Sequence, residues 1–247
     1  MKNLLYIIVL TTQVFFANNG FEKGNSLYQK GKYQEAITAY ESVLASNKQA
    51  AELYFNLGNC YYKLNKVAPS IYYYEKALVL NPSDAEIHNN LKFAQKLLID
   101  EVKEVPKVGF DKLISDFTSA YSPNTWAWIT IVLAFLFLFF FVGYYFSYRT
   151  AYKRVFFIGL FFLLLLMLGS VFSAIYEKTR FEKEQPAIVF VEVATVKSEP
   201  KSEAPEAFVL HEGTKVFIKE TLDNWLKIQL ADGTEGWIES DEVKKVK

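Results

Sequence analysis

The sequence predicts a multidomain membrane protein with three parts: an all-α segment of helical repeats, a two-helix transmembrane hairpin and a small all-β barrel. Three observations lead to this fold class. Residues 21–99 repeat themselves with a period of 34 residues, and two later runs, 126–146 and 155–175, contain no charged residue. Residues 185–247 are instead rich in β-forming residues separated by turn signals. Each uncharged run reaches the ~20 apolar residues that span a bilayer.

The composition excludes several classes of protein. The 27 basic side chains are balanced by 27 acidic ones, so nucleic-acid binding through bulk positive charge is excluded. Cys60 is the single cysteine, which excludes an intrachain disulfide and a CxxC zinc site. His88 and His211 lie far apart in sequence, and we expect no metal centre and no other cofactor. The chain has no Ser/His/Asp set, no Cys/His pair and no glycine-rich phosphate loop, so an enzyme is not expected.

Residues 1–17 are predicted to form an export signal. Lys2 supplies a short basic region, and the apolar stretch 4–10 is too short to span a membrane. Ala17 is the candidate residue before the cleavage site, although Phe15 stands where a small residue is preferred. An uncleaved anchor is the alternative.

Residues 18–99 contain the repeats. At an offset of 34, Gly24 recurs as Gly58 and Tyr40 recurs as Tyr74, while a third copy supplies one capping helix from Ala85 to about Ile99. The second copy resembles the tetratricopeptide repeat family at all eight signature positions, which are Tyr54, Leu57, Gly58, Tyr61, Ser70, Tyr74, Ala77 and Pro82. Gly31 and Asn65 stand at matching turns, where a left-handed residue is expected.

This resemblance implies a concave surface that binds a partner segment. For each tyrosine on that surface, packing inside the repeats is the alternative to contact with the partner. One subtype of the family clamps a terminal carboxylate with asparagines and cations, but Phe21, Glu86 and Asn90 occupy the cationic positions here. Without charge-assisted bonds such a clamp is weak, and we reject it. The groove residues implied by the resemblance are Asn25, Tyr28, Phe55, Asn56, Asn59, Tyr62, Lys63 and Asn90.

Residues 100–125 link the repeats to the membrane. The linker contains apolar residues at helical spacing, which predict an amphipathic helix in the membrane interface or, alternatively, one packed on the last repeat. Ser122-Pro123 is expected to begin the first span as N-cap and first-turn proline, and Trp126 and Trp128 fall where an aromatic belt belongs. The apolar positions are Phe110, Leu113, Ile114, Phe117 and Tyr121.

Charge fixes the expected topology of the spans 126–146 and 155–175. The loop between them, 147–154, contains three cations and no anion. Short basic loops stay in the cytoplasm, so both ends of the hairpin face outward, as the export signal also indicates. Neither span carries an ionisable residue for a transport path, so the hairpin is interpreted as an anchor. We therefore expect two spans with both termini on the outer side of the membrane.

The C-terminal part, 185–247, resembles the bacterial SH3-like family. The resemblance rests on the stretch 210–214, on the strand from Trp225 and on the Asp232-Gly233 turn before Gly236-Trp237-Ile238. It implies that Trp225 lies on the ligand-binding face and that Trp237 is mostly core. A cell-wall peptide and a protein segment are both suitable ligands for an exported barrel.

The order of all the parts resembles the BatE proteins of the Bacteroides aerotolerance operon. This resemblance implies a scaffold in the bacterial inner membrane, with both termini in the periplasm, that belongs to an aerotolerance or stress-related membrane complex. Its partners would be sister membrane proteins with von Willebrand factor A-type domains. A protein-binding scaffold is therefore expected, and the alternative is a cell-wall sensor whose SH3-like domain binds peptidoglycan or a wall-associated peptide.

Overall fold

The computed structural model describes residues 20–102 and 109–247, so the predicted export signal lies outside the described residues. The chain divides into two compact units. One unit contains the repeats together with residues 185–247, and the other, Pro106–Glu184, contains the hairpin. Two segments separated by the whole hairpin in sequence therefore pack together as one unit.

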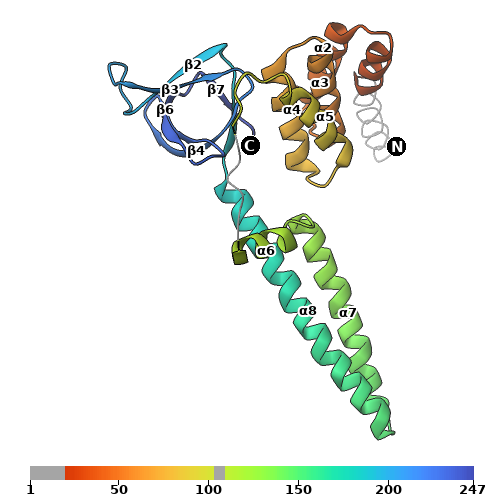
Figure 1. Ribbon diagram of the computed structural model, residues 1–247. Helices are drawn as coiled ribbons and strands as arrows, with labels where there is room; N and C mark the ends of the chain where they lie inside the picture. The colour runs from red at the N-terminus through yellow and green to blue at the C-terminus, as the bar shows by residue number, and fades with distance from the viewer. Residues whose placement is uncertain (1–19, 103–108) are drawn as a thin grey trace, which may run out of the picture. The chain divides into compact units, whose positions relative to one another are not determined.

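The repeats form antiparallel helix pairs (Figure 1). Residues 20–29 are helical, and α2 (Tyr33–Leu44), α3 (Ala51–Lys63), α4 (Val67–Leu80) and α5 (Ala85–Gln95) follow. A Cβ added at Gly58 would lie 2.6 Å from the Tyr74 ring, and one at Gly24 would lie 2.3 Å from the Tyr40 ring. The two glycines thus make room for equivalent buried tyrosines.

The turns between helices follow the predicted chemistry, with one difference. Gly31 and Asn65 have φ values of 73° and 54°, which confirms the left-handed conformation. The Asp84 side chain caps α5 by accepting hydrogen bonds from the backbone N–H groups of Glu86 and Ile87. The expected extension of α5 to about Ile99 is wrong, because the helix ends at Gln95 and the chain then turns toward the barrel.

The C-terminal segment forms one antiparallel sheet that curls into a barrel (Figure 1). The order of its strands is β3-β2-β6-β5-β4-β1-β7. Leu226 and Ile228 point inward as predicted and are 2% and 0% exposed. The bounds are β1 (Pro186–Val189), β2 (Val193–Lys197), β3 (Glu206–His211), β4 (Lys215–Leu222), β5 (Trp225–Gln229), β6 (Glu235–Glu239) and β7 (Val243–Lys245).

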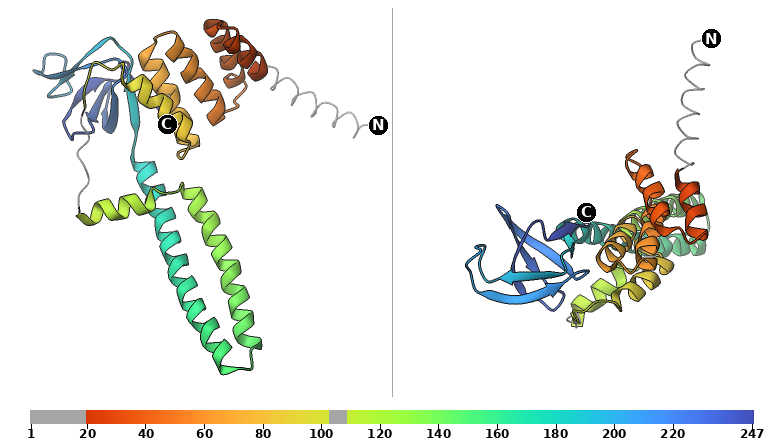
Figure 2. Two further views of the ribbon diagram at one scale, coloured as in Figure 1. Left: turned by 45° about the vertical axis from the view of Figure 1, so that its right-hand side comes forward. Right: turned by 90° about the horizontal axis from the view of Figure 1, so that it is seen from above.

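The second unit contains α6 (Gly109–Thr118), α7 (Pro123–Phe146) and α8 (Thr150–Lys183). Figure 2 shows α7 and α8 side by side, and both are long and apolar enough to cross a membrane. Ser122 Oγ accepts a hydrogen bond from the Thr125 N–H at 3.2 Å, which confirms the predicted N-cap.

Aromatic and polar contacts hold α6 within this unit. The Trp126 ring is 7% exposed and donates its Nε1–H to the Thr118 carbonyl, so it packs within the unit, whereas the Trp128 ring is 67% exposed. Thr118 Oγ1 donates to the Glu177 carboxylate on α8 at 2.6 Å. Phe110, Leu113 and Phe117 of α6 are exposed within this unit, and Ile114 is half-buried. The interfacial position of this helix stays a prediction.

Candidate functional site

The repeats enclose a hollow of 570 Å³ on the surface formed by their first helices. Among the eight predicted groove residues, Asn25 does not line the hollow, and its side-chain oxygen accepts a hydrogen bond from Asn56. Lys63 is exposed at its edge. The hollow thus brings together the other seven, which are Tyr28, Phe55, Asn56, Asn59, Tyr62, Lys63 and Asn90.

Two equivalent polar triads are built by the 34-residue repeat. Asn25 Oδ1 accepts from the Tyr40 hydroxyl at 2.7 Å and from Asn56 Nδ2 at 3.1 Å. One repeat later, Asn59 Oδ1 accepts from the Tyr74 hydroxyl at 2.6 Å and from Asn90 Nδ2 at 2.9 Å. We call these two triads the asparagine ladder; they fix each side-chain amide in one orientation.

The ladder keeps hydrogen-bonding capacity for a ligand. An asparagine amide has two N–H donors and one carbonyl acceptor. Asn56 and Asn90 each use one N–H within the ladder, and Asn25 and Asn59 use only their oxygens. Beyond these ladder bonds the amides carry further N–H groups, and Asn56, Asn59 and Asn90 belong to the lining of the hollow.

Burial keeps the tyrosines of the ladder protonated. Desolvation raises the pKa of Tyr40 and of Tyr74 well above the ordinary value, so both hydroxyls remain donors throughout the physiological range. Burial also raises the pKa of Cys60 to about 12, and this thiol is fully buried. The interpretation of Cys60 as a small buried hydrophobe is therefore confirmed.

Three residues of the hollow were absent from the predicted set. Tyr74 closes its floor, while Glu86 and Phe93 from α5 line its far end. The 34-residue period could have predicted Phe93 as a lining residue. In the third copy Phe93 occupies the position that Asn25 and Asn59 occupy in the first two. The third copy therefore contributes an aromatic ring to the lining of the hollow where the earlier copies have an asparagine.

The outer face of the barrel carries both C-terminal tryptophans. The expectation that Trp237 is mostly core is wrong: Ile238 is 0% exposed, and Trp237 lies half-buried on the opposite face. Leu226 pairs with Ile238, which turns Trp237 outward beside Lys227 because side chains alternate along a strand. Trp225 lies on this same outer face, diagonal to Trp237.

The barrel and the repeats share a continuous interface. Ile188 of β1 and Val246 are buried in the same apolar core as the repeat helices. The rings of Tyr72 and Phe190 meet edge to face, with their centroids 5.5 Å apart. Lys215 Nζ lies 2.7 Å from the buried Glu75 carboxylate. No part of this interface was predicted from the sequence.

Comparison with known families agrees with both domains of this unit. Residues 21–85 match the family described as tetratricopeptide repeat, and residues 192–244 match the one described as bacterial SH3 domain. None of the curated proteins matches the chain. The fold and these matches support a protein-interaction or cell-wall-binding role for this unit.

Proposed function

We propose that this protein is a membrane-anchored scaffold that holds an extended segment of a partner protein in its repeat groove. The asparagine ladder is the observation that carries the proposal. An extended peptide presents backbone N–H and C=O groups along its length, and ordered side-chain amides pair with both kinds of group. The rings of Phe55 and Phe93, which also line the hollow, would accept side chains of that segment.

Resemblance to the BatE proteins supplies the proposed setting. The scaffold would work in the inner membrane, within an aerotolerance or stress-related complex, and its partners would be membrane proteins with von Willebrand factor A-type domains. The described lining of the groove contains one cation, Lys63, together with the acidic Glu86, which is not the charge pattern of a carboxylate clamp. An internal segment of the partner therefore fits the groove better than a free C-terminus.

Removing two of the ladder amides tests whether the groove binds the partner. Asn56→Ala combined with Asn90→Ala removes two groups that face the hollow, and each lost hydrogen bond costs about 0.5–1.5 kcal/mol. We expect partner recovery after purification from solubilised membranes to fall roughly tenfold or more. Asn59 is left intact because Tyr74 depends on its oxygen.

The matched control for this experiment is Gln34→Ala, which changes an exposed polar residue of α2 outside the hollow. Helical content measured by circular dichroism should be equal in the three proteins. Undiminished partner recovery with a folded double variant would contradict binding in the groove.

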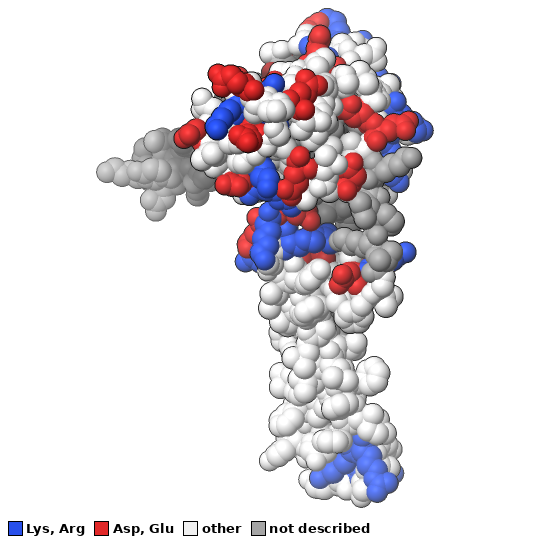
Figure 3. Space-filling model, turned by 60° about the vertical axis from the view of Figure 1, so that its left-hand side comes forward, with Lys and Arg blue, Asp and Glu red and all other residues white. Residues whose placement is uncertain are grey.

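The proposed topology places both termini in the periplasm and the loop 147–154 in the cytoplasm. Basic side chains gather at the loop end of the hairpin, beyond an uncharged stretch (Figure 3). The segments before and after the hairpin share one core, which requires both on the same side of the membrane. A chain that crosses the membrane twice returns to the side from which it started, so a two-span hairpin meets this requirement.

A pair of reporter fusions tests this topology. A reporter that is active only in the periplasm should be active when fused after Lys247 and inactive when inserted at Thr150. The same two fusions with a reporter active only in the cytoplasm should give the reverse result. Activity at Thr150 in the first pair would show that the proposed orientation is inverted.

Cell-wall binding is the second candidate function, favoured by Trp225 and Trp237 on one outer face of the barrel. Half-buried aromatic rings are typical anchors for a ligand. If this face binds the wall, the intact protein should be retained on purified sacculi, and Trp225→Ala with Trp237→Ala should abolish retention. Equal retention of the double variant would exclude this face as the wall contact.

A further inference from the structure

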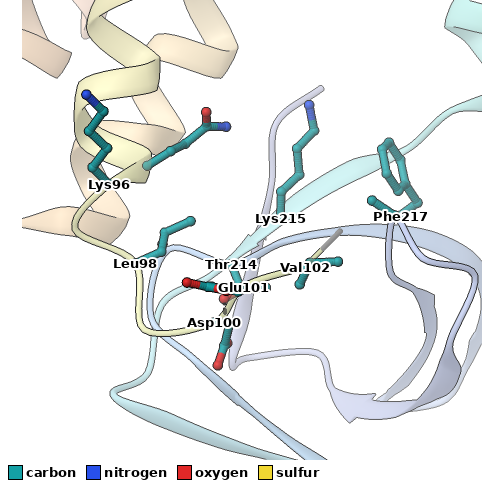
Figure 4. A pocket seen from close by; sticks show the side chains of 10 residues that line it. Lys96, Leu98, Asp100, Glu101, Val102, Thr214, Lys215 and Phe217 are labelled. Atoms are coloured by element: carbon teal, nitrogen blue, oxygen red, sulfur yellow. Dashed lines mark hydrogen bonds between the residues drawn. The ribbon is translucent and has the colours of Figure 1, made fainter. Parts of the chain in front are cut away.

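Residues 98–102, beyond the turn that follows α5, run along the barrel. Its side chains alternate: Leu98, Asp100 and Val102 are half-buried, while Ile99 and Glu101 are exposed. Figure 4 shows the segment crossing beside the turn between β3 and β4. Alternation with a period of two is the pattern of an extended strand that presents one face to a surface.

Each of the three inward side chains meets the barrel. A Cβ added at Gly213 would lie 2.7 Å from Leu98 Cδ2, so the leucine packs closely on a glycine whose φ is +88°. Val102 packs against the buried core of the barrel. The two apolar residues thus flank Asp100 on both sides.

Asp100 is the polar anchor of the segment. One carboxylate oxygen accepts from the His211 backbone N–H at 2.7 Å and from Thr214 Oγ1 at 2.6 Å, and the other lies 2.7 Å from His211 Nδ1. Burial alone would raise the pKa of Asp100, but the hydrogen bonds from Thr214 and His211 outweigh it and lower that pKa. The carboxylate is therefore held in its charged form by charge-assisted bonds.

We propose that the turn between β3 and β4 is a binding site for an extended segment of the form apolar-x-Asp-x-apolar, and that residues 98–102 are its occupant in cis. Specific pockets for alternate side chains, with a central charged anchor, are how protein surfaces recognise extended peptides. This site is separate from the outer face of Trp225 and Trp237, which the segment leaves open.

Occupation in cis has a consequence for the whole unit. A short tether gives the segment a millimolar effective concentration at the turn, so a competing segment from another chain must bind tightly to displace it. With the site occupied, strand β1 of the barrel contacts α4, and the groove on the first helices stays accessible. The two ligand-binding surfaces are then held in a fixed geometry.

Hydrogen exchange of the full-length protein in detergent micelles tests the anchor. In Asp100→Ala, amides of the β3–β4 turn should exchange about tenfold faster or more, because bonds to a charged group are stronger than neutral ones. Glu101→Ala is the matched control and should exchange like the wild type. An unchanged turn in Asp100→Ala, or an equal effect of Glu101→Ala, would overturn the proposal.

A double variant tests whether the contact is direct. Thr214→Val removes one donor to Asp100, so adding it to Asp100→Ala should accelerate exchange little beyond the larger single effect. Fully multiplicative acceleration would show that the two residues act independently and would contradict the proposed anchor.

A synthetic peptide then tests whether the turn is a binding site. Residues 96–102 as a free heptapeptide, at about millimolar concentration, should restore protection of the turn in the Asp100→Ala protein. The same peptide with asparagine in place of the aspartate should not. Failure of the first peptide, or equal protection by both, would refute recognition of the Asp-centred segment.

Discussion

Tyr74→Ala is expected to unfold the repeats. The Tyr74 side chain is 1% exposed, fills the space left by Gly58 and also supplies the hydroxyl of the second ladder triad. Truncating a large buried aromatic side chain typically costs about 3–5 kcal/mol, which approaches the whole free energy of unfolding of a small domain. The loss should be seen as fast hydrogen exchange throughout α3 and α4.

Tyr74→Phe is the matched control for that prediction. It keeps the ring and removes only the hydroxyl, so we expect a cost of about 1 kcal/mol and preserved helices. Because Asn59 would lose one of its two donors, partner binding should weaken more than stability does. Similar exchange in the alanine and phenylalanine variants would contradict the packing role given to the ring.

Ile238→Ala is expected to destabilise the barrel strongly, whereas Trp237→Ala should leave it folded. Ile238 is fully buried in the barrel core, and such a truncation costs about 2–5 kcal/mol. Trp237 lies outside that core, on the outer face. Hydrogen exchange of β4, β5 and β6 in both full-length variants measures the difference. Faster exchange in Trp237→Ala than in Ile238→Ala would reverse the assignment of the two faces.

The groove was predictable because its information is local and periodic. The offset of 34 places equivalent residues on equivalent helices, so Asn25, Asn59 and their tyrosine partners form the same triad twice. Sequence alone did not distinguish a binding asparagine from a packing one. In the structure the oxygens of Asn25 and Asn59 accept hydrogen bonds from buried tyrosine hydroxyls, and Asn56, Asn59 and Asn90 line the hollow. Binding of a partner by these amides stays a prediction.

The outward position of Trp237 could have been predicted from the sequence by working out the strand register. Once Leu226 and Ile228 are assigned to the inner face, the Asp232-Gly233 turn fixes the register of the next strand. That register places Ile238 opposite Leu226 and turns Trp237 outward. Residue size suggested a core tryptophan, but the pairing register decides the face.

The contact of Asp100 with His211 was not predictable in this way. The two residues are 111 positions apart, and the whole hairpin lies between them in sequence. No periodicity connects a short acidic linker to a turn in another domain. The alternation of residues 98–102 becomes meaningful only when the surface that they contact is known.

Site-specific photo-crosslinking in living cells tests the scaffold proposal most directly. A photoreactive phenylalanine derivative in place of Tyr62 lies in the groove, and the same group in place of Gln34 lies outside it. The proposal predicts a discrete crosslink to a second protein from position 62, none from position 34, and loss of the first when Asn56 and Asn90 are alanine. No crosslink from position 62, or an equally strong one from position 34, would contradict it.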